Sequence, residues 1–402
     1  MCVAGRAHRL YGRGRSGGRI DLDFNLTEEQ ILLGRSVARF LREHYPFDAR
    51  RRAVNGGDGW RPSIWRDFVE QLGIVGLGVP QELGGQGAGP VEMMVVMEEM
   101  GRALVVEPFL ETAIIGASLL SQSDGATSRA ALKALAVGNM VLAFAWAEPG
   151  MRYDVADIML QARRSEGGWR LHGGKSVVTG APWATHLIIA ARTAGEKGDG
   201  EGLSLFLVDR KAEGLTFFDY PTIDGRRASD LLFDDVFVAP DALMGTEGEA
   251  LPLIETAMSR GIAGGCAEAV GAMQRMLDDT MAYTRDRRQF GKALSEFQSL
   301  QHRMVEMSMK LEMARSATIL ATLRLEGDRH ERELALSSAK VTVSQAARFV
   351  GQNAIQLHGG MGMTDDLPLG HYFKRTMIIE SEFGTIDHHL RRHVQLSRQQ
   401  AA

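Results

Sequence analysis

Residues 283–292 read Tyr283-Thr-Arg-Asp-Arg-Arg-Gln-Phe-Gly-Lys292, a basic block that follows a long stretch of helical periodicity. Arginine offers a planar fork of N–H donors that suits phosphate oxygens, and Gly291 lets the backbone come close to a ligand. Basic residues at a helix end also complement the helix dipole without any ligand. The block by itself leaves both interpretations open.

A second block, Gln356-Leu-His-Gly359-Gly360, follows another helical stretch. Paired glycines after a helix are typical of a C-cap. They also leave bare backbone against which a flat or phosphorylated ligand can lie. Here too a structural and a binding interpretation stand side by side.

The chain divides into three regions that differ in their hydrophobic periodicity. Residues 26–135 have helical periodicity, and Thr27-Glu-Glu-Gln30 has the form of a capping box at its start. Short alternating runs over residues 141–245, rich in β-branched and aromatic side chains, predict antiparallel strands in a small barrel or sandwich. Helical periodicity then returns and predicts a bundle of four long antiparallel helices at residues 254–283, 297–325, 334–357 and 373–391.

The predicted fold class is therefore mostly α with a central β domain. We expect an N-terminal helical domain at residues 23–140, a middle β-barrel domain at 141–248 and a C-terminal four-helix bundle at 249–402. Residues 1–19 contain five arginines and no acids, so residues 1–22 are expected to form a disordered tail.

The composition is that of an ordinary globular protein. The 402 residues are 45% hydrophobic and 24% charged, with a net charge of -4, which gives no reason to expect nucleic-acid binding. No run approaches the roughly twenty apolar residues of a membrane span. Cys2 and Cys266 match no metal spacing, which favours a reducing cytoplasm. The adjacent His388 and His389 would diverge on a helix, so no metal site is expected.

Taken in order, the blocks resemble the acyl-CoA dehydrogenase family from about residue 26 to residue 393. The segments that carry the resemblance are Pro80 with Gly84-Gly85-x-Gly87, Ala147-Glu148-Pro149-Gly150, Gly174-Lys175 with Thr179, Phe233-Asp234-Asp235-Val236 with Pro240, and the two blocks at 287 and 356. Each segment is weak alone, and the ordered set is specific.

The resemblance implies an FAD between the β domain and the bundle, with its adenine end reaching a neighbouring subunit. It implies α,β-dehydrogenation of an acyl-CoA thioester, with electrons passing to an electron-transferring flavoprotein. The residues it implies for FAD are Arg287, Gln289, Phe290, Gln356, Gly359, Gly360, Thr179, Ala147 and Thr385. Arg260 and Tyr153 are implied on the substrate side.

The chain departs from the family at the catalytic base. The family reads Glu-Gly-Thr where this chain has Phe383-Gly-Thr, and a phenylalanine cannot take a proton. Some relatives carry the glutamate on an earlier helix, but the matching residue is Ser259, which needs an activating base. Glu382 and Glu380 are candidates for a relocated base. One residue along a helix turns a side chain by about 100°, so a surface or interface carboxylate is the alternative for each.

The side of the site that would face the flavin ring also departs from the family. Ala147, Tyr153 and Val177 stand where threonine, serine and tryptophan are usual, whereas the adenosine-side blocks are intact. The segment 383–389 resembles the accessory subunit of actinobacterial heteromeric acyl-CoA dehydrogenases. That resemblance implies a heterotetramer of lipid β-oxidation. In it, Arg287 and Gln356 of this chain contact a flavin whose reactive ring lies in a partner chain. A self-sufficient homotetramer with a relocated base and a scaffold without cofactor are the alternatives. Neither the acyl chain length nor a sterol rather than fatty acyl substrate can be read from the sequence.

Overall fold

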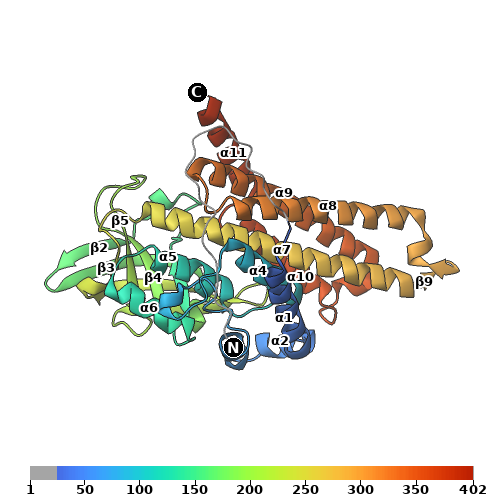
Figure 1. Ribbon diagram of the computed structural model, residues 1–402, viewed down its shortest axis with the longest axis horizontal. Helices are drawn as coiled ribbons and strands as arrows, with labels where there is room; N and C mark the ends of the chain where they lie inside the picture. The colour runs from blue at the N-terminus through green and yellow to red at the C-terminus, as the bar shows by residue number, and fades with distance from the viewer. Residues whose placement is uncertain (1–24, 402) are drawn as a thin grey trace.

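The computed structural model describes residues 25–401, so the tail predicted at residues 1–22 lies outside the described residues. Helices, a β domain and a helical bundle follow one another as predicted (Figure 1). None of the helices within residues 25–401 combines the length and apolar character that a membrane crossing requires.

The N-terminal region is helical. Thr27 and Gln30 form the predicted capping box, because Thr27 Oγ1 accepts from the Gln30 amide while Gln30 Oε1 accepts from the Thr27 amide. A seven-residue π-helix, η2, carries the buried side chain of Glu111, and π-helical turns are frequent at functional sites. The elements are α1 (Glu28–His44), α2 (Phe47–Val54), α3 (Pro62–Glu70), α4 (Pro90–Ala103), η2 (Leu110–Gly116), α5 (Ala117–Ser121) and α6 (Ala126–Ala136).

The β domain is one eight-stranded sheet with the order β6-β7-β3-β2-β4-β5-β8, and β1 pairs with β4. The sheet curls around its own core, since Trp169 of β3 and Phe206 of β5 touch with ring centroids 5.5 Å apart across two intervening strands. The strands are β1 (Leu142–Ala145), β2 (Gln161–Ser165), β3 (Gly168–Thr179), β4 (His186–Arg192), β5 (Leu203–Asp209), β6 (Leu215–Pro221), β7 (Arg227–Val238) and β8 (Leu243–Met244).

Two details of the predicted strands were wrong. The predicted runs are short, but Gly168–Thr179 forms one twelve-residue strand, β3, whose pairing with β7 shifts register between Lys175 and Val178. The sheet is also not wholly antiparallel, because β1 pairs with β4 in parallel, Leu142 opposite His186. Short apolar runs do not reveal their partner, so strand direction could not be read locally.

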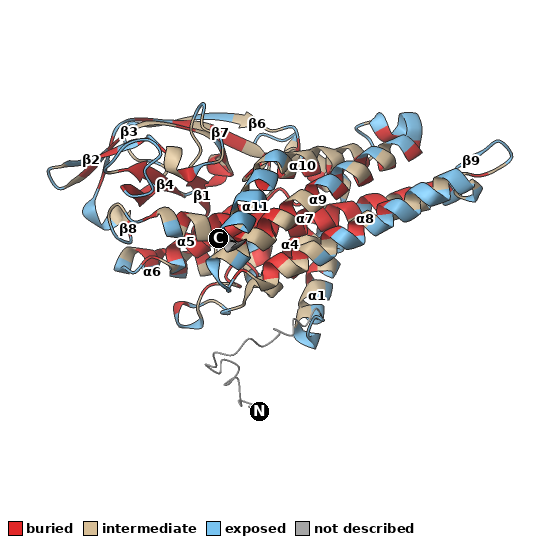
Figure 2. Ribbon diagram, turned by 90° about the horizontal axis from the view of Figure 1, so that it is seen from above, coloured by how far each residue is buried: buried red, intermediate tan, exposed pale blue. Residues whose placement is uncertain are grey.

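The C-terminal bundle surrounds the long helix α7, which is buried along its centre (Figure 2). Glycines let α4 and α7 cross closely: a Cβ on Gly271 would lie 1.8 Å from the Glu98 carbonyl oxygen. The elements are α7 (Leu251–Asp286), the hairpin β9 (Arg288–Gln289) and β10 (Lys292–Ala293), α8 (Gln298–Leu323), α9 (Arg329–His358), α10 (Leu369–Ser381) and α11 (Ile386–Ala401).

The predicted continuous helix at 373–391 is wrong, because α10 ends at Ser381 and α11 begins at Ile386. In the turn between them Phe383 has φ 57° and Gly384 has φ 125°, both incompatible with a right-handed helix. Thr385 then opens α11 by accepting a hydrogen bond from the His388 amide, 3.4 Å, onto its Oγ1. The break places residue 383 at the boundary between the bundle and the β domain.

Candidate active site

A cavity of about 370 Å³, here called the junction cavity, lies where the β domain, η2 and the α10–α11 turn meet. It contains Thr179, Ala147 and Tyr153, three of the residues predicted around a ring, together with Phe383. The remaining lining residues come from the β domain, η2 and the end of α10. They are Leu110, Glu111, Ile115, Phe144, Trp146, Glu148, Met151, Arg152, Ser176, Val177, Thr222, Asp224, Arg226, Ile378, Ser381 and Glu382.

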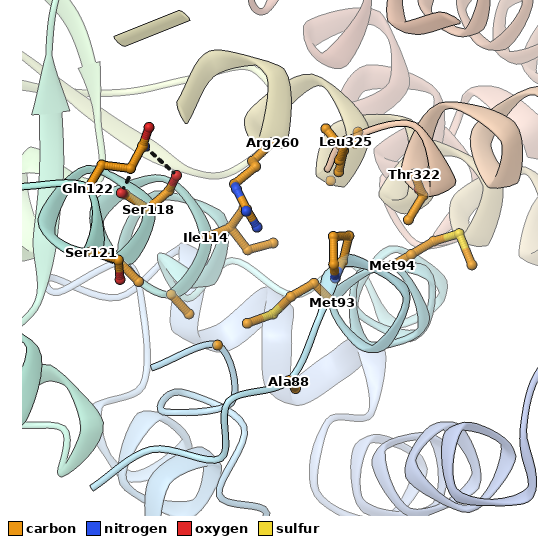
Figure 3. Close-up of a pocket in the computed structure, with 16 residues that line it drawn as sticks. Ala88, Met93, Met94, Ile114, Ser118, Ser121, Gln122, Arg260, Thr322 and Leu325 are labelled. Carbon is orange, nitrogen blue, oxygen red and sulfur yellow. Dashed lines mark hydrogen bonds between the residues drawn. The ribbon is translucent and has the colours of Figure 1, made fainter. Parts of the chain in front are cut away.

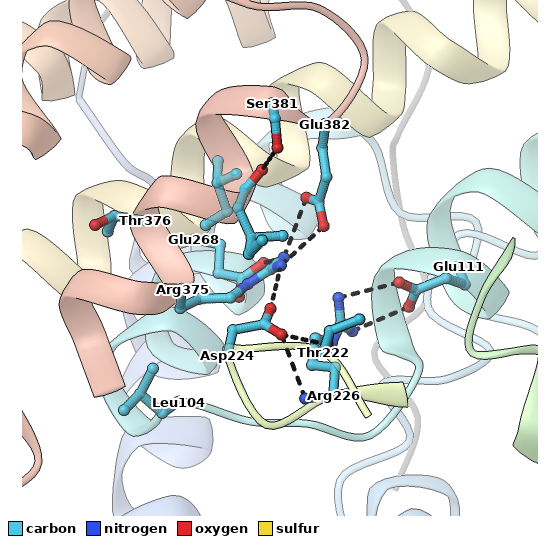
Figure 4. A network of polar contacts seen from close by, with 12 residues as sticks. Leu104, Glu111, Thr222, Asp224, Arg226, Glu268, Arg375, Thr376, Ser381 and Glu382 are labelled. Atoms are coloured by element: carbon cyan, nitrogen blue, oxygen red, sulfur yellow. Dashed lines mark hydrogen bonds and ion pairs between the residues drawn. The ribbon is translucent and has the colours of Figure 1, made fainter. Parts of the chain in front are cut away.

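All four acids that line the junction cavity are ion-paired. Glu111 faces Arg226, with an Oε1 to Nη1 distance of 3.0 Å, and Glu148 lies 2.7 Å from Lys175 Nζ. Asp224 and Glu382 share Arg375 at 3.0 and 2.8 Å. Arg375 also forms two hydrogen bonds, of 2.6 and 2.8 Å, with the buried Glu268 of α7 (Figure 4). The cavity is therefore bounded by paired charges from three parts of the chain.

Burial governs the titration of these groups. It raises the pKa of the Glu111 carboxyl, while the adjacent Arg226 guanidinium lowers it. It lowers the pKa of Lys175 to about 8, against the opposing effect of Glu148. Among the carboxyls that line the cavity, Glu111 is therefore the one whose protonated form is most clearly favoured by burial.

Neither of the predicted relocated bases is free. Glu382 lines the junction cavity, but its carboxylate bonds Arg375. Glu380 is outside the lining and bonds Arg348 of α9. Ser259 is buried outside the lining of the junction cavity, and its hydroxyl donates to Glu333, 2.8 Å away. Phe383 itself lines the cavity at the expected position.

A second cavity, here called the helical cavity, has a volume of about 120 Å³ and lies among α4, η2, α5 and α7 (Figure 3). Met93, Ile114 and Leu325 supply apolar surface. Arg260, predicted on the substrate side, lines it and pairs with Glu326 at 2.6 Å. Gln122 donates to Ser118 at the same rim. The combination of apolar walls and a cationic rim suits a molecule with an apolar tail and an anionic head.

The third hollow, here called the bundle-end groove, joins the ends of α7 and α9 beside the β9–β10 hairpin. It brings together four predicted cofactor residues, Arg287, Gln356, Gly359 and Gly360. Within residues 25–401 the Arg287 guanidinium makes no hydrogen bond or ion pair. A Cβ added to either glycine would meet nothing within 4 Å. The groove therefore has the open backbone and the available donors that a phosphate ligand requires.

Three predicted residues are not brought into these hollows. Gln289 and Phe290 lie on the exposed hairpin, where the Phe290 side chain is 91% exposed and contacts Phe297. Thr385 caps α11 and is absent from the lining of the junction cavity. The junction cavity and the groove share no lining residue. Phe383 packs on Gly261 of α7, and Arg287 follows 26 residues later, about 39 Å along the helix at 1.5 Å per residue, so the two hollows are far apart in one chain.

Three family models match the chain in sequence order: the acyl-CoA dehydrogenase N-terminal domain over residues 27–139, the middle domain over 143–236 and the C-terminal domain over 251–395. The chain belongs to the acyl-CoA dehydrogenase family. The predicted family and fold are confirmed, and with them the assignment of FAD as cofactor and of the chain as an oxidoreductase flavoprotein.

Similar proteins include both reductases and dehydrogenases. A 3-(aryl)acrylate reductase of Clostridium sporogenes is 29% identical over 324 residues, 79% of this chain and 85% of that protein. A structure described as the FAD complex of PigA has a TM-score of 0.87 at 25% identity and covers 94% of this chain and all of that one. A structure of a variant of the Tcur3481-Tcur3483 steroid ACAD has a TM-score of 0.83 at 27% identity and covers 93% of this chain and 99% of that one.

The residues of this structure fit FAD in two separate places. The groove supplies unpaired Arg287 donors and bare backbone at Gly359 and Gly360 for a phosphate-bearing portion. The junction cavity supplies the hydroxyls of Thr179 and Ser176 beside Trp146 for a flat ring.

Sequence reasoning missed the buried charges around the junction cavity: Glu111, Asp224, Arg226, Glu268 and Arg375. Asp224-Gly-Arg226 resembles an exposed hairpin turn, and charged residues on helices are usually solvated. The one signal available was Glu111 inside an otherwise apolar run, residues 109–120, and such a carboxyl needs a buried partner.

Proposed function

We propose that this chain is the accessory subunit of a heteromeric acyl-CoA dehydrogenase. It binds the adenosine and pyrophosphate end of an FAD through the bundle-end groove, and a catalytic partner chain supplies the carboxylate that removes the α proton. The observation that carries the proposal is the contrast at the two sites. Phe383 and four ion-paired acids line the junction cavity, whereas Arg287 is without a partner among residues 25–401.

The division of labour follows from what the side chains can do. FAD, when bound, accepts the hydride that leaves the β carbon. The α proton must go to a group that is basic at neutral pH, and a carboxylate engaged by a guanidinium is a weak base. Arg287, with the backbone at Gly359 and Gly360, can bind and orient an anionic ligand at a subunit boundary.

The comparisons support this assembly without specifying it. The Tcur3481-Tcur3483 steroid ACAD has a two-part designation, and this chain resembles it over 93% of its length. We extend the proposal to an acyl-CoA as substrate, an electron-transferring flavoprotein as redox partner and a cytoplasmic location. The reductase among the relatives leaves the direction of electron flow to be measured.

Flavin content tests the proposal. The chain should be purified alone and after co-expression with a second acyl-CoA dehydrogenase chain that carries glutamate at the position of Phe383. We expect little bound FAD and no acyl-CoA turnover for the chain alone, and both in the co-expressed assembly. Stoichiometric FAD with turnover by the lone chain would exclude an accessory role.

Self-sufficient catalysis has one specific observation in its favour, the burial of Glu111 at the junction cavity with a raised pKa. If Glu111 is the relocated base, Glu111→Gln abolishes turnover while Glu382→Gln leaves it unchanged. If a partner supplies the base, neither substitution lowers the turnover of the correctly folded assembly more than a few-fold. The cofactor-free scaffold conflicts with the family's use of FAD and is not retained.

A further inference from the structure

We propose that Phe383, with Ile115 and Leu110, forms a wall that closes the helical cavity from the junction cavity. A ligand held in the helical cavity then cannot reach the ring site of the same chain. The inference deepens the proposed function and rests on it, in that the helical cavity is taken to receive the acyl group.

The wall is built against two glycines of α7. A Cβ placed on Gly261 would lie 3.1 Å from Phe383 Cζ and 3.1 Å from Ile115 Cδ1, so both side chains pack directly onto the helix backbone. A Cβ on Gly264 would lie 2.8 Å from Leu110 Cδ1. Phe383 packs against the core cluster of the N-terminal region and against that of the bundle. The two cavities share no lining residue; the three wall side chains line the junction cavity, and Gly264, on which Leu110 packs, lines the helical cavity.

The backbone of the wall is held in an unfavourable conformation. Phe383 has φ 57°, a region that L residues with large side chains rarely adopt. Three side chains fix the turn: Arg375 binds the Glu382 carboxylate, Lys340 Nζ donates to the Glu382 carbonyl at 2.7 Å, and His389 Nε2 lies 3.1 Å from the Phe383 carbonyl oxygen. A strained turn with this many restraints places the aromatic ring firmly in the wall.

The helical cavity adjoins another hollow on the side away from the wall. Met94 and Thr322 line the helical cavity and also line a hollow of about 230 Å³ with Leu26 and Ile319, between the start of α1 and α8. A long apolar tail with its anionic head near Arg260 can therefore extend toward α8, away from the wall. An acyl thioester held in this way does not present its reactive carbons to the flavin.

Photolabelling distinguishes the two sides of the wall. The probe is an octanoyl-CoA with a diazirine on its last carbon, and the labelled residues are mapped by mass spectrometry in the full chain. In the wild type we expect labels near Met93 and Ile114. In Phe383→Ala the labels at Trp146 and Tyr153, which line the junction cavity, should rise at least tenfold. Phe218→Ala is the matched control, because that side chain is 56% exposed and on the β domain.

Ile115→Ala removes a second side chain of the wall and should reproduce the labelling pattern of Phe383→Ala. It takes the place of Phe383→Ala in the test if that variant fails to fold. Labels at Trp146 in the wild type, or the wild-type pattern in both opened variants, would overturn the wall. Absence of labels from the helical cavity would overturn the ligand site. None of these outcomes depends on how many flavins the assembly binds, so they are separable from the test of the accessory role.

Discussion

In the junction cavity each lining carboxylate is bound to a cation of the same chain, whereas in the bundle-end groove Arg287 has no partner among residues 25–401. The ion pairs of the junction cavity satisfy its charges, whereas the bundle-end groove has hydrogen-bond donors available for a ligand. Buried ion pairs and an aromatic wall are features of a site fixed by its own structure. Open donors beside bare glycine backbone are features of a site completed by another molecule.

Removing Arg375 should produce the largest effect. Arg375→Ala leaves Glu268, Asp224 and Glu382 without their common partner in a buried setting, and breaking a buried pair costs about 3–5 kcal/mol. Chemical denaturation should show this loss for Arg375→Ala and a change within about 0.5 kcal/mol for Arg287→Ala. Equal losses of stability in the two variants would contradict the distinction between a structural junction cavity and a ligand-binding groove.

Arg287 should instead affect the cofactor. A charge-assisted hydrogen bond contributes about 1.5–3 kcal/mol, so Arg287→Ala should weaken FAD binding to the co-expressed assembly by roughly ten- to a hundredfold. Flavin retention during dialysis measures the loss. Arg163→Ala on the exposed strand β2 is the control and should retain FAD as the wild type does. Unchanged retention in Arg287→Ala would remove the groove from the cofactor site.

The turn that holds Phe383 should respond to acid. Burial lowers the pKa of His389 from an ordinary value near 6.5 to about 3. Because the folded pKa is depressed, the unfolded chain binds more protons between pH 3 and 6.5, and the stability contributed by neutral His389 is present above pH 6.5 and lost as the pH falls. Between pH 6.5 and 5.5 the wild type should lose about 1 kcal/mol more than His389→Asn. Parallel pH profiles for the two proteins would show that His389 is not held neutral.

Val177 should give the smallest effect. It has φ 52° at the rim of the junction cavity, its side chain is 59% exposed, and β-branched residues are strained in this region. Val177→Asn should stabilise the chain by about 0.5–1 kcal/mol, because asparagine tolerates a left-handed backbone. Thermal unfolding measures the change. Val305→Asn on the exposed face of α8 should not stabilise the protein, since asparagine is no better a helix former than valine. A loss of stability in Val177→Asn would mean that the valine side chain makes a contact that outweighs the strain.

The sequence predicted the order of the domains, most helices and the grouping of Arg287, Gln356, Gly359 and Gly360. The domains and helices follow from local periodicity, whereas the grouping of residues 287 and 356 was implied by the family resemblance. It did not predict the break at Phe383, because residues 373–391 keep an apolar period compatible with one helix. Nor did it predict the Arg375 network, whose members come from residues 224, 268, 375 and 382. Tertiary contacts of this kind join residues that carry no local sign of burial.

Native mass spectrometry of the assembly co-expressed with a glutamate-bearing partner tests the central claim most directly, because it counts chains and flavins together. We expect this chain alone to carry less than one FAD per two chains and to show no acyl-CoA turnover. The assembly should contain both kinds of chain with bound FAD, and its turnover should depend on the partner's glutamate. One FAD per chain in an assembly of this chain alone, with turnover of an acyl-CoA, would contradict the account.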